Sequence, residues 1–105
     1  MPKIGKAARG KHRWIGLVFN EKYSKINSVS EAIQNLIHQK NVKLFDYINE
    51  DNRKSCIIKI KLGEYGPVKE KLRNNENSIF SITSSGKIRL VRLRLDEYFQ
   101  RQIDD

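Results

Sequence analysis

The segment that most constrains how this 105-residue chain can fold is residues 14–19, which read Trp-Ile-Gly-Leu-Val-Phe. The run has the length of a strand and is apolar at every position, instead of alternating apolar with polar residues. A strand of this kind is typical of the middle of a sheet, where both of its faces pack against other parts of the protein. The sequence therefore predicts a central strand over residues 14–19.

The clearest helical pattern follows this strand after a polar connection. Ser28 and Glu31 stand three residues apart and have the identities of a capping box, in which each side chain bonds the backbone N–H of the other residue. The apolar residues behind them recur at i, i+3, i+4, i+7 and i+8, as on one face of a helix. They are Val29, Ala32, Ile33, Leu36 and Ile37. These signals predict a helix that begins at Ser28 and ends near Gln39 or Lys40.

Two strand-like runs come next, at residues 42–48 and 53–62, and the polar residues 49–52 join them as a turn. In the second run, alternate apolar residues share one face: Cys56, Ile58, Ile60 and Leu62. The pair Gly66-Pro67 then predicts the start of a short helix, because proline is favoured at the first helical position. Val68 and Leu72 would be its buried pair. Residues 78–83 predict a further strand.

Residues 84–95 alternate cations with branched apolar residues after a Ser-Gly turn. This alternation predicts a strand that turns its cations outward: Lys87, Arg89, Arg92 and Arg94. The apolar phase shifts between Leu90 and Val91, which implies a bulge or a strand that passes into a helix. Beyond Asp96, the spacing of Tyr98 and Phe99 with Leu95 predicts a short C-terminal helix.

The predicted order is strand, helix, strand, strand, helix, strand. It indicates an α+β fold, the ferredoxin-like βαββαβ two-layer sandwich, with two helices on one face of an antiparallel sheet and a short C-terminal helix added. The other face of the sheet would stay open for a partner. Residues 1–11 carry small and basic residues without a period and predict a flexible basic arm. Residues 12–105 predict a single domain.

The charge balance favours a nucleic acid as the partner. Lysine and arginine number 21 against 12 acidic residues, and the net charge is +9. Such an excess is typical of proteins that bind a polyanion, and arginine suits phosphate because it donates two parallel hydrogen bonds. The candidate contacts lie in the arm and in the cationic run: Lys3, Lys6, Arg9, Lys11, Arg13, Lys87, Arg89, Arg92 and Arg94. The alternatives are an ordinary disordered tail and an edge strand whose cations discourage aggregation.

Catalytic and metal-binding chemistry has little support in this sequence. The two histidines, His12 and His38, fall in separate predicted elements. Cys56 is the single cysteine, so an internal disulfide and a cysteine-based zinc site are both excluded. No phosphate-binding loop, nucleophile elbow or zinc-protease motif occurs. We therefore expect a protein that is not an enzyme by itself and binds no cofactor. Without a signal peptide or a membrane-spanning apolar stretch, a soluble cytoplasmic protein is expected.

Base stacking across the middle of the sheet is not predicted. RNA-recognition motifs stack bases on aromatic residues of their first and third strands. Here the predicted third strand contains no aromatic residue. The aromatic residues of the first and second predicted strands are interpreted as core: Trp14, Phe19, Phe45 and Tyr47.

With this element order and the Ser-Gly turn, the chain resembles the small ferredoxin-like protein subunit of archaeal and eukaryotic ribonuclease P, called protein component 2 in archaea. Residues 12–18, His-Arg-Trp-Ile-Gly-Leu-Val, are similar to the basic and aromatic opening strand of the family. Residues 84–89, Ser-Ser-Gly-Lys-Ile-Arg, are similar to its V-S-G-T-I-R-like turn. Lys87 stands where the family often has threonine, and the chain ends in acidic instead of basic residues.

The resemblance implies a non-catalytic subunit of a ribonucleoprotein that removes the 5′ leader from precursor tRNA. In that family RNA performs the chemistry with magnesium ions, and the protein pairs with another protein subunit. The basic residues named above would contact the ribonuclease P RNA or precursor tRNA, while Tyr47 and Ile57 would hold the protein partner. Two alternatives remain open: a nucleic-acid-binding module outside ribonuclease P, of ribosomal or chromatin type, and a protein-interaction adaptor.

Overall fold

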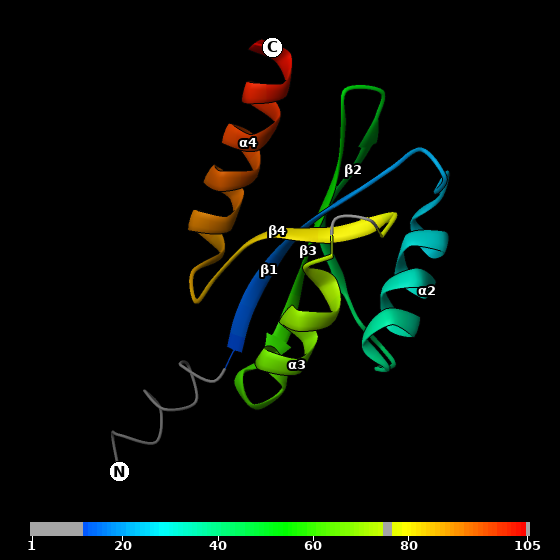
Figure 1. Ribbon diagram of the computed structural model, residues 1–105, viewed down its shortest axis with the longest axis vertical. Coiled ribbons are helices and arrows are strands. Elements are labelled where there is room, and N and C mark those ends of the chain that lie inside the picture. Colours follow the sequence, from blue (N-terminus) through cyan, green and yellow to red (C-terminus); the bar gives the residue numbers. More distant parts are fainter. Residues whose placement is uncertain (1–11, 75–76, 105) are drawn as a thin grey trace.

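The structure, a computed structural model, describes residues 12–74 and 77–104 (Figure 1). These residues form a small α+β domain of four strands and three helices. In chain order the elements are β1 (His12–Phe19), α2 (Ile26–Ile37), β2 (Leu44–Glu50), β3 (Arg53–Lys61), α3 (Leu62–Leu72), β4 (Ile79–Ser85) and α4 (Ile88–Asp104). No helix among the described residues has both the length and the apolar character needed to cross a membrane.

The four strands form one antiparallel sheet in the order β2-β3-β1-β4. β1 therefore pairs with a strand on each side, and residues 15–19 are buried. Ile15 and Leu17 point to one face of the sheet, whereas Val18 packs on the other. The predicted central strand is confirmed, because a strand buried on both faces has no position that tolerates a polar residue.

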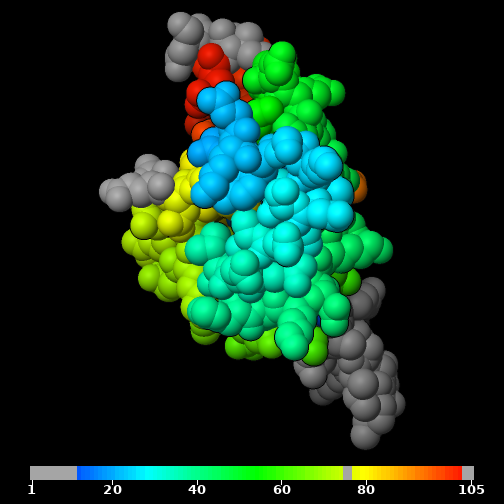
Figure 2. Space-filling model, turned by 90° about the vertical axis from the view of Figure 1, so that its right-hand side faces the viewer, coloured from blue at the N-terminus to red at the C-terminus, as the bar shows by residue number. Residues whose placement is uncertain are grey.

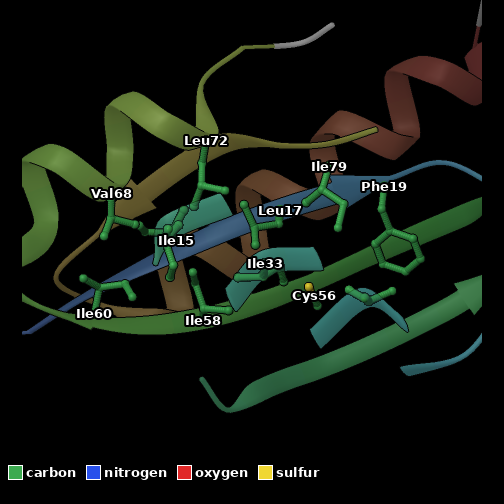
Figure 3. Close-up of a cluster of buried hydrophobic side chains, with 12 residues drawn as sticks. Ile15, Leu17, Phe19, Ile33, Cys56, Ile58, Ile60, Val68, Leu72 and Ile79 are labelled. Atoms are coloured by element: carbon green, nitrogen blue, oxygen red, sulfur yellow. The ribbon is translucent and has the colours of Figure 1, made fainter. Parts of the chain in front are cut away.

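The larger core lies between the sheet and helices α2 and α3 (Figure 3). β1 and β3 contribute alternate residues to it, and the two helices contribute their apolar stripes. The helical members are Val29, Ile33 and Ile37 of α2 and Val68 and Leu72 of α3. The predicted pair of α3 is therefore confirmed, and three of the five residues in the predicted α2 stripe are buried, while Ala32 and Leu36 are partly buried against the core. In Figure 2, α2 and the segment leading into it fill the face toward the viewer, so that β1 is hidden behind them.

The predicted ends of α2 are wrong by two to three residues. The helix begins at Ile26, its N-cap is Lys25, and no side chain caps it. The N–H of Ser28 instead donates to the carbonyl oxygen of Lys25 over 3.1 Å, so the predicted capping box does not form. At the other end His38 adopts a left-handed conformation with φ 56°, which stops the helix.

The start of α3 was predicted five residues too late. The helix follows β3 directly at Leu62, so that Pro67 lies inside it. Proline in this position removes one backbone hydrogen bond of the helix. Pro67 is exposed, whereas Val68 and Leu72, which hold α3 against the sheet, are buried. Tertiary packing therefore extends this helix beyond its local start signal.

The largest difference from prediction concerns residues 88–95, which form the first half of α4 and not a strand. Ile88, Val91 and Leu95 recur at i, i+3 and i+7, a helical stripe hidden within the alternating pattern. The chain turns after β4, where the Ser85 hydroxyl accepts from the N–H of Lys87. The carbonyl oxygen of Lys87 then accepts from Leu90 and Val91 as the helix begins.

α4 packs on the face of the sheet that was expected to stay open. Val91 and Leu95 are buried there against Val18 of β1 and Ile57 of β3. Gly16 permits this close approach, because a Cβ at this position would lie 2.9 Å from both the Val91 Cγ1 and the Thr83 Cγ2 atoms. Contacts of that length force the neighbouring atoms apart. The expectation of an open face is therefore wrong: the sheet has helices on both faces.

The single cysteine, Cys56, lies in the core between the sheet and α2. Its burial predicts how the free energy of unfolding changes with pH. Burial raises the pKa of Cys56 from 9.0 to about 12, because the thiolate would lose its hydration. The folded state therefore keeps the thiol neutral where the unfolded chain ionises. We expect the free energy of unfolding to be unaffected by this group below pH 9 and to fall as pH rises from 9 toward 12.

A comparison with Cys56→Ala isolates this effect, since the variant lacks the thiol but retains every tyrosine and lysine. Urea unfolding curves at pH 8 and pH 10.5 should differ more for the wild type than for the variant. The thiol of the native protein should also react slowly with a disulfide reagent until urea opens the core. Rapid reaction of the native protein would contradict the burial of Cys56.

Candidate nucleic-acid interface

The strand register brings two cationic parts of the sequence to one end of the sheet. Trp14 of β1 pairs with Ser85 of β4 on one side and with Lys59 of β3 on the other. The start of β1, the end of β3 and the turn that leads into α4 are therefore neighbours (Figure 1). We call this region the basic end; its cations are Arg13, Lys59, Lys61, Lys87 and Arg89.

Contacts at the basic end place two of its segments directly side by side. A Cβ on Gly86 would lie 3.4 Å from a guanidinium nitrogen of Arg13, so the turn after β4 contacts the start of β1. Lys61, Lys87 and Arg89 are exposed, and none of them forms an ion pair within the described residues. The carboxylate closest in sequence to Lys61 is that of Glu64, which accepts a hydrogen bond from Gln39.

Three of the predicted RNA-binding residues thus meet at the basic end: Arg13, Lys87 and Arg89. The residues Lys3, Lys6, Arg9 and Lys11 lie outside the described part of the chain. That segment joins the domain at His12, and hence at the basic end. The RNA contacts themselves stay a prediction.

Arg92 and Arg94 lie farther along α4, and each donates hydrogen bonds to the sheet, Arg92 to β2 and Arg94 to the end of β4. The Arg92 Nε atom donates to Asp46 of β2 over 2.6 Å, and a second bond of 3.3 Å makes the contact bidentate. The hydrogen bond, and then the charge, of Asp46 raises the pKa of Arg92. Arg94 donates to the Thr83 hydroxyl and to the Ser84 carbonyl oxygen. The predicted cationic strand does not form, and its four cations are divided between the turn and α4.

The two residues expected to hold a protein partner lie on opposite faces of the sheet. Ile57 is fully buried beneath α4, whereas Tyr47 packs against the α2 side and stacks on Phe19 at a ring distance of 5.8 Å. The cause is a bulge in β2, where Asp46 has a positive φ of 52° and the register with β3 shifts. The bulge sends Phe45 and Tyr47 to different faces, although they are two residues apart.

Sequence reasoning missed a group of aromatic and lysine side chains on the α4 face. Trp14 and Phe45 meet edge to face with ring centroids 5.1 Å apart. The ammonium of Lys59 lies 5.2 Å from the Trp14 ring centroid, and that of Lys43 lies 5.2 Å from the Phe45 centroid. We call these four residues the aromatic–lysine cluster. Phe19 is core as predicted, but Trp14 and Phe45 are only partly buried. Only the cross-strand pairing of these residues could have predicted the cluster. That pairing follows from the strand register, which the sequence does not give.

A groove of about 440 Å³ lies at the other end of β1, between the β2–β3 turn and the second half of α4. Its polar wall includes Arg53, whose guanidinium donates to Asp96 over 2.7 Å and lies 5.1 Å from the Phe99 ring centroid. These contacts fasten α4 to the sheet. Among the described residues, no three acidic, histidine or cysteine side chains gather in a way that could hold a metal ion.

No protein-family model matches the chain, and no curated protein matches it. A function is therefore inferred from the geometry and charge of the basic end and from the residues that meet there.

Proposed function

We propose that this protein is a non-catalytic, RNA-binding subunit of ribonuclease P that supports the catalytic RNA in the 5′ maturation of precursor tRNA. One support is the arrangement of the domain. We interpret the βαββαβ order, with strand order β2-β3-β1-β4, as the ferredoxin-like fold of the small ribonuclease P subunit, with α4 added. The magnesium ions of the reaction would belong to the RNA, and the protein would hold no cofactor.

The observation that carries the proposal is the meeting of two motifs at the basic end. The segments that resemble the ribonuclease P family, residues 12–18 and 84–89, are 65 or more positions apart in the sequence. In the sheet they are neighbours, because Trp14 pairs with Ser85. The partly exposed residues of the first segment, His12, Arg13 and Trp14, therefore lie beside the second segment. A shared surface is the arrangement expected if both segments serve one RNA contact.

The chemistry of the basic end suits the sugar–phosphate chain. Lysine and arginine there can neutralise phosphates and release counterions, which gives affinity without sequence readout. Exposed Lys61, Lys87 and Arg89 come from two different parts of the chain. Asp46 is paired with Arg92, whereas Glu64 accepts only from the neutral Gln39 side chain and keeps its charge. Lys61, Lys87 and Arg89 form no ion pair within the described residues, so their charge is directed to solvent.

The native partners test this proposal most directly. We expect tagged full-length protein recovered from its own cells to carry ribonuclease P RNA, together with a second ribonuclease P protein. Sequencing the bound RNA and identifying the bound proteins would check this. Recovery of ribosomal RNA alone would favour a nucleic-acid-binding module outside ribonuclease P. Recovery of proteins without RNA would favour an adaptor, and either result would overturn the proposal.

A further inference from the structure

We propose that the aromatic–lysine cluster binds one unpaired nucleotide of an RNA strand, with the base stacked on Trp14 and the adjacent phosphates held by Lys59 and Lys43. This inference rests on the proposed RNA binding and adds a site to it. An interface that holds only phosphates, by charge, would not need a surface that binds a base.

The rings lie at the boundary between the core and the solvent. Trp14 and Phe45 pack on their inner side against the apolar residues beneath α4, which include Ile57 and Val91. They stay partly exposed, and both lysines are exposed. A ring fixed on one side by a core and open on the other is the arrangement of a stacking platform, because little conformational freedom is lost when a base lands on it.

The lysines show that ring surface is accessible to a positive group. The ammonium groups of Lys59 and Lys43 each lie 5.2 Å from a ring centroid, within the range of a cation–π contact. At an exposed site such a contact is weak, and the lysine stem is flexible. An arriving base can therefore take the ring face, and the displaced ammonium can pair with the phosphate on either side of that base.

The surroundings limit the ligand to a single strand. α4 covers the rest of this face, where Val18 and Ile57 are buried, so the platform has room for only a short stretch of strand. A base inside a duplex is stacked on its neighbours, so neither of its faces is free to stack on a protein ring. Two carboxylates that observed contacts place on this side, Asp46 and Asp96, are bound to Arg92 and Arg53 respectively. A loop, bulge or strand end of RNA fits these conditions.

Trp14 is the only tryptophan in the chain, so its fluorescence reports on the platform alone. The test uses the full-length protein with two probes of equal charge: a 12-nucleotide oligouridylate and a 12-unit abasic strand that has phosphates but no bases. We expect the oligouridylate to quench Trp14 emission and to bind about tenfold more tightly than the abasic strand, which should not quench. Fluorescence anisotropy of end-labelled probes gives the affinities.

Variants separate the two parts of the site. Trp14→Leu should abolish the preference for the strand with bases, and Phe45→Leu should reduce it. Tyr98→Leu is the matched control, because Tyr98 is a partly buried aromatic residue that packs on the same core from α4. It should keep the full preference. Lys59→Ala should weaken both probes and lower the log–log salt slope by about 0.7. Circular dichroism would verify the fold of each variant.

The possible results distinguish this inference from the proposal on which it rests. Equal affinity for the two probes, or binding of oligouridylate without quenching of the wild type, would overturn the nucleotide site. If a ribonuclease P RNA transcript still bound with a steep salt dependence, the proposed function would stand without it. If neither strand nor the transcript bound at all, both would fall. The fluorescence of the wild type decides the question even if Trp14→Leu fails to fold.

Discussion

Leu95→Ala is expected to lower the free energy of unfolding by about 2–5 kcal/mol, whereas Leu93→Ala changes it by less than about 0.5 kcal/mol. In α4 these residues lie on different sides of the helix: Leu95 is 2% exposed, and Leu93 is 53% exposed. Removing the Leu95 side chain leaves a cavity between α4 and the sheet. Removing the Leu93 side chain takes apolar surface away from water.

The pair is a matched test of secondary structure as well as of packing. In a strand, Leu93 and Leu95 would point to the same face and would be buried together, so their alanine variants would destabilise the protein to a similar extent. Urea denaturation followed by circular dichroism measures both variants against the wild type. Equal losses would contradict the helix and would restore the interpretation of residues 87–95 as a strand.

The double variant Lys87→Ala/Arg89→Ala is expected to weaken binding of a ribonuclease P RNA transcript about a hundredfold. Each cation can make a charge-assisted hydrogen bond to phosphate worth roughly 1.5 kcal/mol, and two such bonds correspond to about a factor of 100. Because two phosphate contacts disappear, the slope of log affinity against log salt concentration should become shallower by about two. Filter binding or fluorescence anisotropy measures both the affinity and the slope. The potassium chloride concentration is varied over roughly 50–300 mM, a range wide enough to resolve such slopes.

A control of equal charge comes from the other end of β1. Lys22 and Lys25 are exposed residues that follow β1, far along the strand from the basic end. Lys22→Ala/Lys25→Ala removes the same charge from the protein but leaves the basic end unchanged. We expect it to alter affinity only a few-fold. If both double variants lost the same affinity, net charge and not the basic end would govern binding.

The parts of the fold that could be predicted are those that one short pattern determines. An unbroken apolar run identified the central strand, and helical spacing identified the buried faces of α2 and α3. The alternating stretch after Ser85 fits two periods, since Ile88, Val91 and Leu95 satisfy a helix while alternate residues satisfy a strand. Local sequence does not decide between them. Tertiary packing on the sheet favours the helix, and Gly16, distant in the chain, leaves the room that this packing needs.

The candidate site shows the same division between local and distant information. Composition alone identified a basic protein and its two cationic segments. It could not show that Trp14 lies beside Ser85, because that contact depends on the register of β1 with β4. Composition also could not show that Tyr47 and Ile57 lie on opposite faces of the sheet. That difference comes from the bulge at Asp46, whose positive φ reverses the alternation of β2. Asp46 also forms a salt bridge with Arg92. The two residues are far apart in the chain, so the sequence does not indicate that they pair.

That same bulge has a consequence for how molecules of this protein meet one another. β2 is an outer strand of the sheet, with a row of backbone groups that another chain could extend. A left-handed residue in its middle bends the strand and interrupts the regular spacing of donors and acceptors, and the salt bridge to α4 fixes the bend. Concentrated solutions should therefore resist fibril growth along β2.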